Sequence, residues 1–181
     1  MRIRRATADD AAAIASIYAP YVEASVVSFE MEAPDEAEIR NRIEALGDLY
    51  PWLAACDEDG AMLGYAYACA FRPRPAYRFS VETTVYVAQG AHGCGIGGAL
   101  YGALLPVLEA QGFVQAIGAI TIPNEASIAL HEKFGFVRAG LYEKVGYKLG
   151  DWRSVGLWQK ALAPMTAGPE EPRPVSAVWA G

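Results

Sequence analysis

His92-Gly-Cys-Gly-Ile-Gly-Gly98 is the stretch that decides the fold of this chain. The residues before it, Phe79 to Val87, are rich in β-branched and aromatic side chains, which is typical of a strand. After it, apolar residues recur at helical spacing, so a helix is predicted to begin between Ile96 and Gly98. Glycines let backbone N–H groups approach an anion closely, and a helix start adds unpaired donors and the positive end of a dipole. The sequence therefore predicts a site for a phosphorylated ligand.

The glycine spacing alone leaves the ligand open. A Walker loop requires Lys and then Ser or Thr after its last glycine, whereas Ala99 and Leu100 follow Gly98. Gly93, Gly95 and Gly98 fit the dinucleotide fingerprint, but no acidic residue ends the next strand-like run, where the ribose hydroxyls would need one. A third reading is the pyrophosphate loop of an acyl-CoA-dependent transferase, and a fourth is a turn that binds nothing.

Composition narrows the class of protein. The chain has 181 residues, a net charge of −6, 53% hydrophobic and 20% charged residues, which suits one soluble globular domain. No basic run, secretory leader or long apolar stretch is present, so we expect a cytoplasmic protein that binds neither nucleic acid nor membrane. Its three cysteines are far apart and match no zinc spacing, so neither a disulfide nor a metal site is predicted.

The expected elements follow the order β-α-α-β-β-β-α-β-α-β-β, which indicates an α/β or α+β domain with a mixed sheet. A second helix is predicted to begin at Pro34, and Pro106 should kink the helix that follows the glycine loop. Residues 1–163 are predicted to form the domain. Residues 164–181, with several prolines and acids, are predicted to be a flexible tail.

A few residues are candidates for catalysis or substrate binding. Glu82 is the best candidate general base; it lies in the middle of an otherwise uncharged strand, on one face with Thr84 and Tyr86. Such a carboxylate lies either at a solvated edge or in a cleft; composition alone favours the solvated edge, and the glycine loop just beyond the strand favours the cleft. The loop just before this strand contains the residues suited to an anionic substrate group, Arg72, Arg74 and Tyr77. Asn124 is predicted to cap a helix that also carries His131, and Phe29 is a weaker substrate-binding candidate.

Three segments together make a more specific pattern than any glycine motif. These are Phe71 to Val87, the glycine loop, and Asn124-Glu-Ala-Ser-Ile-Ala-Leu-His-Glu-Lys-Phe-Gly-Phe136, with Lys144 to Trp152 as a fourth match. Over residues 2–162 the chain resembles the phosphinothricin and methionine-sulfoximine acetyltransferase branch of the GNAT superfamily. His92 takes the Gln/Arg place of the superfamily motif, with Gly95 and Gly97 as its two glycines, so differently arranged loop contacts are expected.

The resemblance implies a mixed central sheet of about seven strands flanked by about four helices, and acetyl-CoA as co-substrate. It implies Glu82 as general base, and His131 stands where many members of the superfamily carry a tyrosine acid. Coenzyme binding would fall to backbone and loop residues: Val85, Tyr86, Val87, His92, Gly93, Cys94, Gly95, Ile96, Gly97, Gly98, Asn124 and Ser127. Acceptor binding would fall to Phe29, Arg72, Arg74, Tyr77, Thr83 and Thr84. A homodimer that uses the late strands is also implied.

The sequence therefore predicts direct acetyl transfer from acetyl-CoA to the amine of a small amino-acid-like acceptor. One alternative is a GNAT enzyme for another amine, such as a polyamine or a protein N-terminus. Another is a relative that binds CoA as a sensor without turnover, although the intact Glu82 argues against it. A nicotinamide oxidoreductase is the third alternative.

Overall fold

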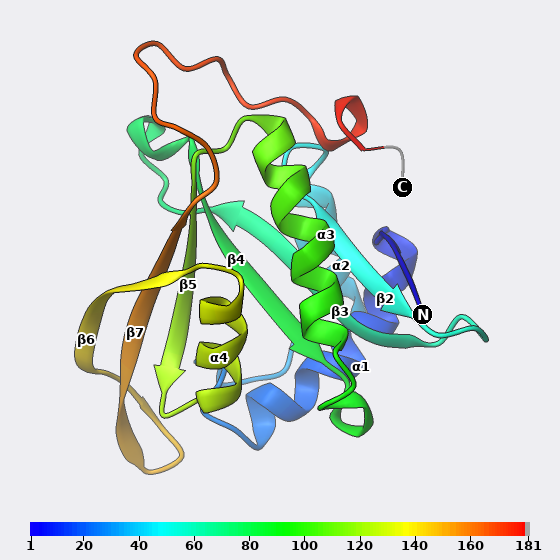
Figure 1. The fold of residues 1–181 in the computed structure, drawn as a ribbon. Helices are drawn as coiled ribbons and strands as arrows, with labels where there is room; N and C mark the ends of the chain where they lie inside the picture. The colour runs from blue at the N-terminus through cyan, green and yellow to red at the C-terminus, as the bar shows by residue number, and fades with distance from the viewer. Residues whose placement is uncertain (180–181) are drawn as a thin grey trace.

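A single mixed sheet with helices on both faces forms the molecule (Figure 1), and the computed structural model describes residues 1–179. The seven strands lie in the order β1-β2-β3-β4-β5-β7-β6. The strands are β1 (Arg2–Arg5), β2 (Trp52–Cys56), β3 (Met62–Ala70), β4 (Ser80–Val87), β5 (Gln115–Ile122), β6 (Val137–Lys148) and β7 (Asp151–Ala161). The helices are α1 (Ala11–Glu23), α2 (Glu36–Leu46), α3 (Ile96–Gln111) and α4 (Glu125–Lys133). The predicted fold class is confirmed.

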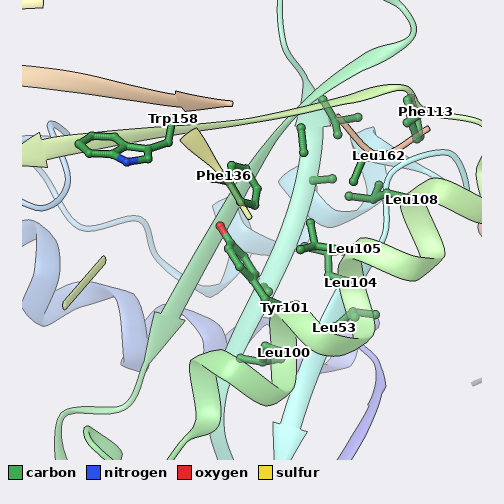
Figure 2. Packing of buried hydrophobic residues seen from close by; sticks show 14 of the residues in the cluster. Leu53, Leu100, Tyr101, Leu104, Leu105, Leu108, Phe113, Phe136, Trp158 and Leu162 are labelled. Carbon is green, nitrogen blue, oxygen red and sulfur yellow. The ribbon is translucent and has the colours of Figure 1, made fainter. Parts of the chain in front are cut away.

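Two hydrophobic cores hold the layers together, one on each face of the sheet. On one face the apolar sides of α1 and α2 pack on β2 and β3, around Ile14, Ile39 and Tyr65. On the other face α3 packs its Leu100, Leu104 and Leu108 stripe onto the strands, as Figure 2 shows. Alternate residues of β4 therefore point into different cores, which gives its two faces different chemistry.

The centre of the sheet contains one parallel pair, and this pair opens after a short contact. β4 and β5 pair only from Ser80 to Glu82 on β4, whereas both strands continue for several residues beyond. On its other side β4 stays paired with β3 as far as Val87. The backbone of the second half of β4 is thus left without a sheet neighbour on the β5 side.

Local differences from the sequence prediction have plain causes. The second helix begins at Glu36, not at Pro34, because the Asp35 side chain accepts a hydrogen bond from the Glu38 N–H and acts as the N-cap. As predicted, Pro106 lies inside helix α3, on its exposed face, and the predicted kink stays a prediction.

The segment after β7 contacts the domain in its described part. The Val175 side chain is fully buried, and its N–H donates to the Asp48 carbonyl. The Gln111 side chain, on α3, donates to the carbonyl of Arg173 at 2.7 Å. Composition gives no sign of these contacts. The predicted boundary at residue 163 and the predicted flexibility of the tail stay predictions, for which the contacts suggest a direct test.

Candidate active site

The opening between β4 and β5 exposes backbone groups in the middle of the sheet. The Ala88 N–H donates to the Leu63 carbonyl on β3, so by the alternation of an antiparallel ladder the backbone groups of Tyr86 also point toward β3. Those of Val85 and Val87 point the other way, into the gap. Only two of the three predicted backbone positions therefore face the opening, and the Tyr86 ring packs against Tyr18 and Tyr21.

A groove of about 490 Å³ begins at this gap and continues along the glycine loop. We call it the glycine groove; its lining includes Val85, Val87, His92, Gly93, Gly95, Ile96, Gly97, Gly98, Asn124 and Ser127. Helix α3 begins at Ile96, as predicted, after Gly95 in the left-handed region with φ +79°. The first N–H groups of α3 have no intrahelical partner. The groove thus offers backbone donors and a helix N-terminus, which fit a pyrophosphate.

His92 turns back toward β4 at the start of the loop. Its Nε2 lies 2.7 Å from the Tyr21 hydroxyl and 3.2 Å from the Val87 carbonyl oxygen. The Tyr21 hydroxyl itself donates to the Val87 carbonyl at 2.6 Å. His92 therefore ties the loop to the end of the strand through its side chain, an arrangement that the motif position alone did not predict.

A second cavity, of about 550 Å³, lies on the other side of the same gap. We call it the carboxylate cavity because Glu82 lines it, together with Phe29, Glu30, Arg72, Thr83, Thr84 and His131. The two cavities share five lining residues: Val27, Val85, Tyr86, Asn124 and Ser127. A ligand in the glycine groove and a ligand in the carboxylate cavity would meet at the point where β4 leaves β5.

The electrostatics of the carboxylate cavity centre on Glu82. Burial raises the pKa of the Glu82 carboxyl, and the Arg72 guanidinium opposes this change. Arg72 is held at the rim, because its guanidinium lies 4.4 Å from the centre of the Phe71 ring and donates to the Phe71 carbonyl. A carboxylate with a raised pKa is a stronger base, which is the property that proton removal from an amine requires.

His131 lies at the floor of the cavity in a buried hydrogen-bonded chain. Its Nδ1 lies 2.7 Å from the Ser127 carbonyl, which can only accept, so Nδ1 carries the proton. Nε2 then accepts from the Tyr101 hydroxyl at 2.9 Å, and Thr83 lies 3.2 Å beyond Tyr101. Burial lowers the pKa of the imidazole, which keeps it neutral. In this state its one N–H is already used, so an acid role would require a second proton on the ring.

The structure separates the predicted acceptor residues into two groups. Phe29, Arg72, Thr83 and Thr84 line the carboxylate cavity. Arg74 and Tyr77 are exposed and lie outside its lining, and Tyr77 packs edge-to-face on Phe71 at 5.6 Å. Cys94 is exposed in the glycine loop but lies outside the lining of the groove.

On the side of the cavity that α1 and its following loop provide, sequence reasoning singled out Phe29 but missed the polar network around Tyr18. The Tyr18 hydroxyl lies 2.6 Å from Ser28 Oγ and donates to Glu30 at 3.0 Å. Arg42 holds the same carboxylate through two hydrogen bonds. Burial would raise the pKa of Glu30, but Arg42 and Tyr18 together lower it. Tyr18 has helical spacing with Ile14, so its sequence position indicates only a core residue.

Comparison with known proteins identifies this arrangement. Residues 3–154 match the model of the acetyltransferase (GNAT) domain. The chain belongs to the GNAT acetyltransferase family. The predicted superfamily is therefore confirmed. In this GNAT chain the gap between β4 and β5 opens after Glu82, and the glycine groove begins at it.

This GNAT protein is similar to enzymes of the predicted branch. Phosphinothricin N-acetyltransferase of Streptomyces viridochromogenes is 40% identical over 178 residues, which cover 98% of this chain and 96% of the relative. The L-methionine sulfoximine/L-methionine sulfone acetyltransferase of Pseudomonas aeruginosa is 39% identical over 120 residues, covering 66% of this chain and 70% of the relative. The phosphinothricin acetyltransferase of Sinorhizobium meliloti, solved in complex with AcCoA, superposes with a TM-score of 0.89 at 39% identity, covering 96% and 97% of the two chains.

Two further findings concern the described residues of this GNAT chain. No helix among them is long and apolar enough to span a membrane. Residues 1–179 also contain no cluster of three His, Cys, Asp or Glu side chains that could hold a metal ion. The predicted location in the cell and the predicted lack of a nucleic-acid partner stay predictions.

Proposed function

We propose that this protein transfers an acetyl group from acetyl-CoA to the amine of a small amino-acid-like acceptor, such as phosphinothricin or methionine sulfoximine. The observation that carries the proposal is the pair of cavities that meet at Val85, one lined by the glycine loop and the other by Glu82. The names of the similar enzymes support the class of acceptor.

In the proposed reaction Glu82 accepts a proton from the acceptor ammonium, directly or through water, and the free amine attacks the thioester carbonyl. The new C–N bond forms as the C–S bond breaks, without a covalent enzyme intermediate. The backbone groups of Val85 and Val87 face the position where this carbonyl would lie, and an N–H there would stabilise its oxygen as negative charge develops. The nitrogen loses its second proton as the amide forms, and the departing thiolate takes up one proton, directly or through water.

The charged side chains of the carboxylate cavity indicate which charges the acceptor carries. Arg72 is the cation that lines the carboxylate cavity, so it is suited to a carboxylate or phosphinate group. Glu82 and Glu30 supply negative charge elsewhere in the same cavity, which suits an ammonium. An acceptor with both charges, an amino acid or its analogue, matches this distribution better than a polyamine does.

Thiol release from acetyl-CoA tests the proposal against a panel of amines. The panel contains phosphinothricin, methionine sulfoximine, methionine sulfone, two polyamines and a peptide N-terminus. Release with the amino-acid analogues alone is the expected result. Thiol release with a polyamine or the peptide alone would show that the acceptor is not amino-acid-like. Binding of acetyl-CoA without thiol release for any amine would favour a CoA sensor.

The pH dependence of kcat/KM should report Glu82. Activity requires the ionised carboxylate, so the acid limb should lie above the value of about 4.3 typical of a free glutamate, because burial raises the pKa. Arg72→Ala removes the charge that lowers this pKa, so the acid limb should move to higher pH. Arg74→Ala is the matched control and should leave the limb in place. A limb that moves down in Arg72→Ala would contradict the assignment.

Acetyl-CoA binding should depend on the backbone shape of the loop. Gly95 and Gly60 both have positive φ, +79° and +88°, and an added Cβ would meet no heavy atom within 4 Å at either position. Alanine at each therefore introduces similar backbone strain, about 1–2 kcal/mol. Gly95→Ala should weaken acetyl-CoA binding about tenfold in calorimetry, a loss of about 1.4 kcal/mol. Gly60→Ala, in the β2–β3 turn, should not change it, and equal affinities would place the coenzyme elsewhere.

We propose that the protein is a homodimer that uses β6. This strand lies at the edge of the sheet and its hairpin with β7 exposes Val145, Tyr147, Leu149 and Trp152, each by more than half of its surface. Exposed apolar side chains along an unpaired edge favour association. Tyr147→Lys should shift the mass measured by light scattering from dimer to monomer. A wild-type mass of one chain would refute the dimer.

A further inference from the structure

The loop that follows α1 forms a wall of both cavities. Val27 lines the glycine groove and the carboxylate cavity, and Ser28, Phe29 and Glu30 line the carboxylate cavity. Residues 24–30 form no helix or strand. Short local hydrogen bonds, such as those from the Val27 and Glu30 N–H groups to neighbouring serine hydroxyls, stabilise the loop only from within. Its position over the cavity must be fixed by contacts with other elements.

One side chain from the far end of the sheet makes such a contact. Lys148, the last residue of β6, is only 4% exposed, whereas Tyr147 and Leu149 on either side of it are 59% and 57% exposed. Its Nζ donates to the Val22 carbonyl at 2.6 Å and to the Ser28 carbonyl at 2.7 Å. The ammonium thus joins the C-terminal turn of α1 to the middle of the loop, and the first of these carbonyls is one that the helix leaves unpaired.

The same hairpin also holds the ring of Phe29. A Cβ on Gly146 would overlap the Phe29 ring, so the ring lies directly against the glycine backbone of β6. Gly146 pairs with Arg153 of β7, and this register fixes the position of Gly146 along the hairpin. Two residues of β6, Gly146 and Lys148, therefore fix the loop together with Tyr18 and Arg42, which hold Ser28 and Glu30.

The charges around Lys148 explain why a buried ammonium is tolerated there. Burial lowers the pKa of the Lys148 ammonium, and the negative charge of Glu30 opposes this change. Glu30 is itself held by Arg42 and Tyr18. A buried charge contributes little to stability compared with a packed apolar side chain, but it selects one arrangement of its partners strongly. That property suits a residue that sets the position of a loop.

We propose that Lys148 is a positioning residue for the acceptor: through the Val22 and Ser28 carbonyls it holds residues 27–30 as the wall of the carboxylate cavity. The inference rests on the proposed acetyl transfer for its kinetic consequence. Because Ser28, Phe29 and Glu30 line the carboxylate cavity and not the glycine groove, loss of Lys148 should affect the acceptor far more than the coenzyme.

The test compares Lys148→Met with Lys144→Met, a control that removes the same charge from an exposed position of the same hairpin. Lys148→Met leaves two carbonyls without their donor, so we expect the KM for the acceptor to rise about tenfold. The affinity for acetyl-CoA, measured by calorimetry, and kcat at saturating acceptor should change less than twofold. Lys144→Met should match the wild type in all three. An unchanged acceptor KM in folded Lys148→Met would overturn the proposal.

Two further measurements keep the result decisive. Gly146→Ala displaces Phe29 without removing a charge and should also raise the acceptor KM, so it decides the question if Lys148→Met does not fold. Hydrogen exchange does not need activity: amides of residues 24–30 should exchange about tenfold faster in Lys148→Met than in Lys144→Met. If the wild type acetylates no amine of the panel, the proposed function fails, and the exchange rates alone support or overturn the role of Lys148.

Discussion

Replacing Glu82 with glutamine is expected to reduce turnover by about 10²-fold or more near neutral pH while the affinity for acetyl-CoA changes little. Glutamine has the same shape as glutamate but cannot accept the proton of the acceptor ammonium. Glu82 lines the carboxylate cavity and lies outside the lining of the glycine groove, so the substitution should not alter the binding of acetyl-CoA. Thiol release at saturating acceptor measures the turnover, and calorimetry measures the affinity.

The same substitution should not destabilise the fold. Burial raises the pKa of Glu82, which means that the folded state binds this proton more tightly than the unfolded state does. Its contribution to stability is therefore favourable at low pH and is lost as pH rises through the raised pKa. Glu82→Gln removes this cost near neutral pH, so its melting temperature should equal or exceed that of the wild type. Glu143→Gln, at an exposed position, serves as the control in both measurements. Wild-type turnover in Glu82→Gln would remove this carboxylate from the mechanism.

Removal of residues 164–181 is expected to destabilise the domain by about 2 kcal/mol, the range for exposing one buried valine. Val175 is fully buried, and Gln111, itself 1% exposed, would lose the Arg173 carbonyl as a partner. If residues 164–181 were instead a flexible tail, their removal would leave the free energy of unfolding unchanged. Urea unfolding of the truncated and full chains gives the free energies of unfolding.

A point variant locates the effect within the segment. Val175→Ala keeps the chain length and should account for much of the loss, whereas Glu170→Ala, at an exposed position, should account for none. Equal stability of the truncated and full-length proteins would establish the domain boundary at residue 163 and make the tail dispensable. Activity should follow stability in this series, since residues 164–179 line neither cavity.

Much of the fold could be predicted because local signals and the global structure agree. Helix α3 begins within the predicted range, and the predicted strand that ends at Val87 is β4. Glu82 could be singled out because a lone carboxylate in an otherwise uncharged strand lies either at a solvated edge or in a cleft, and the glycine loop just beyond the strand favours the cleft. These features are determined by residues close together in the sequence, so the spacing of apolar residues and glycines is enough to predict them.

What the sequence could not provide is contact between distant segments. The hydrogen bonds from Lys148 to Val22 and Ser28 cross more than a hundred residues, and nothing near Lys148 indicates that its ammonium is buried. Tyr18 lies on a helix face where a core residue and a cavity residue have the same spacing. Arg74 and Tyr77 share a loop with Arg72, but only the geometry of that loop decides which side chain reaches the cavity.

The early end of the β4–β5 pairing has a consequence for the evolution of the enzyme. On one side of the gap the glycine groove is lined in part by Gly93, Gly95, Gly97 and Gly98, whose main-chain groups most substitutions elsewhere leave in place, so binding of the proposed coenzyme there would tolerate such mutations. On the other side, around the Glu82 carboxylate, the wall is made of side chains from several separate segments, among them those around Ser28, Arg72 and Thr121. Each of these can change independently. A lineage built on this scaffold can therefore exchange one amine for another while the transfer chemistry is inherited intact.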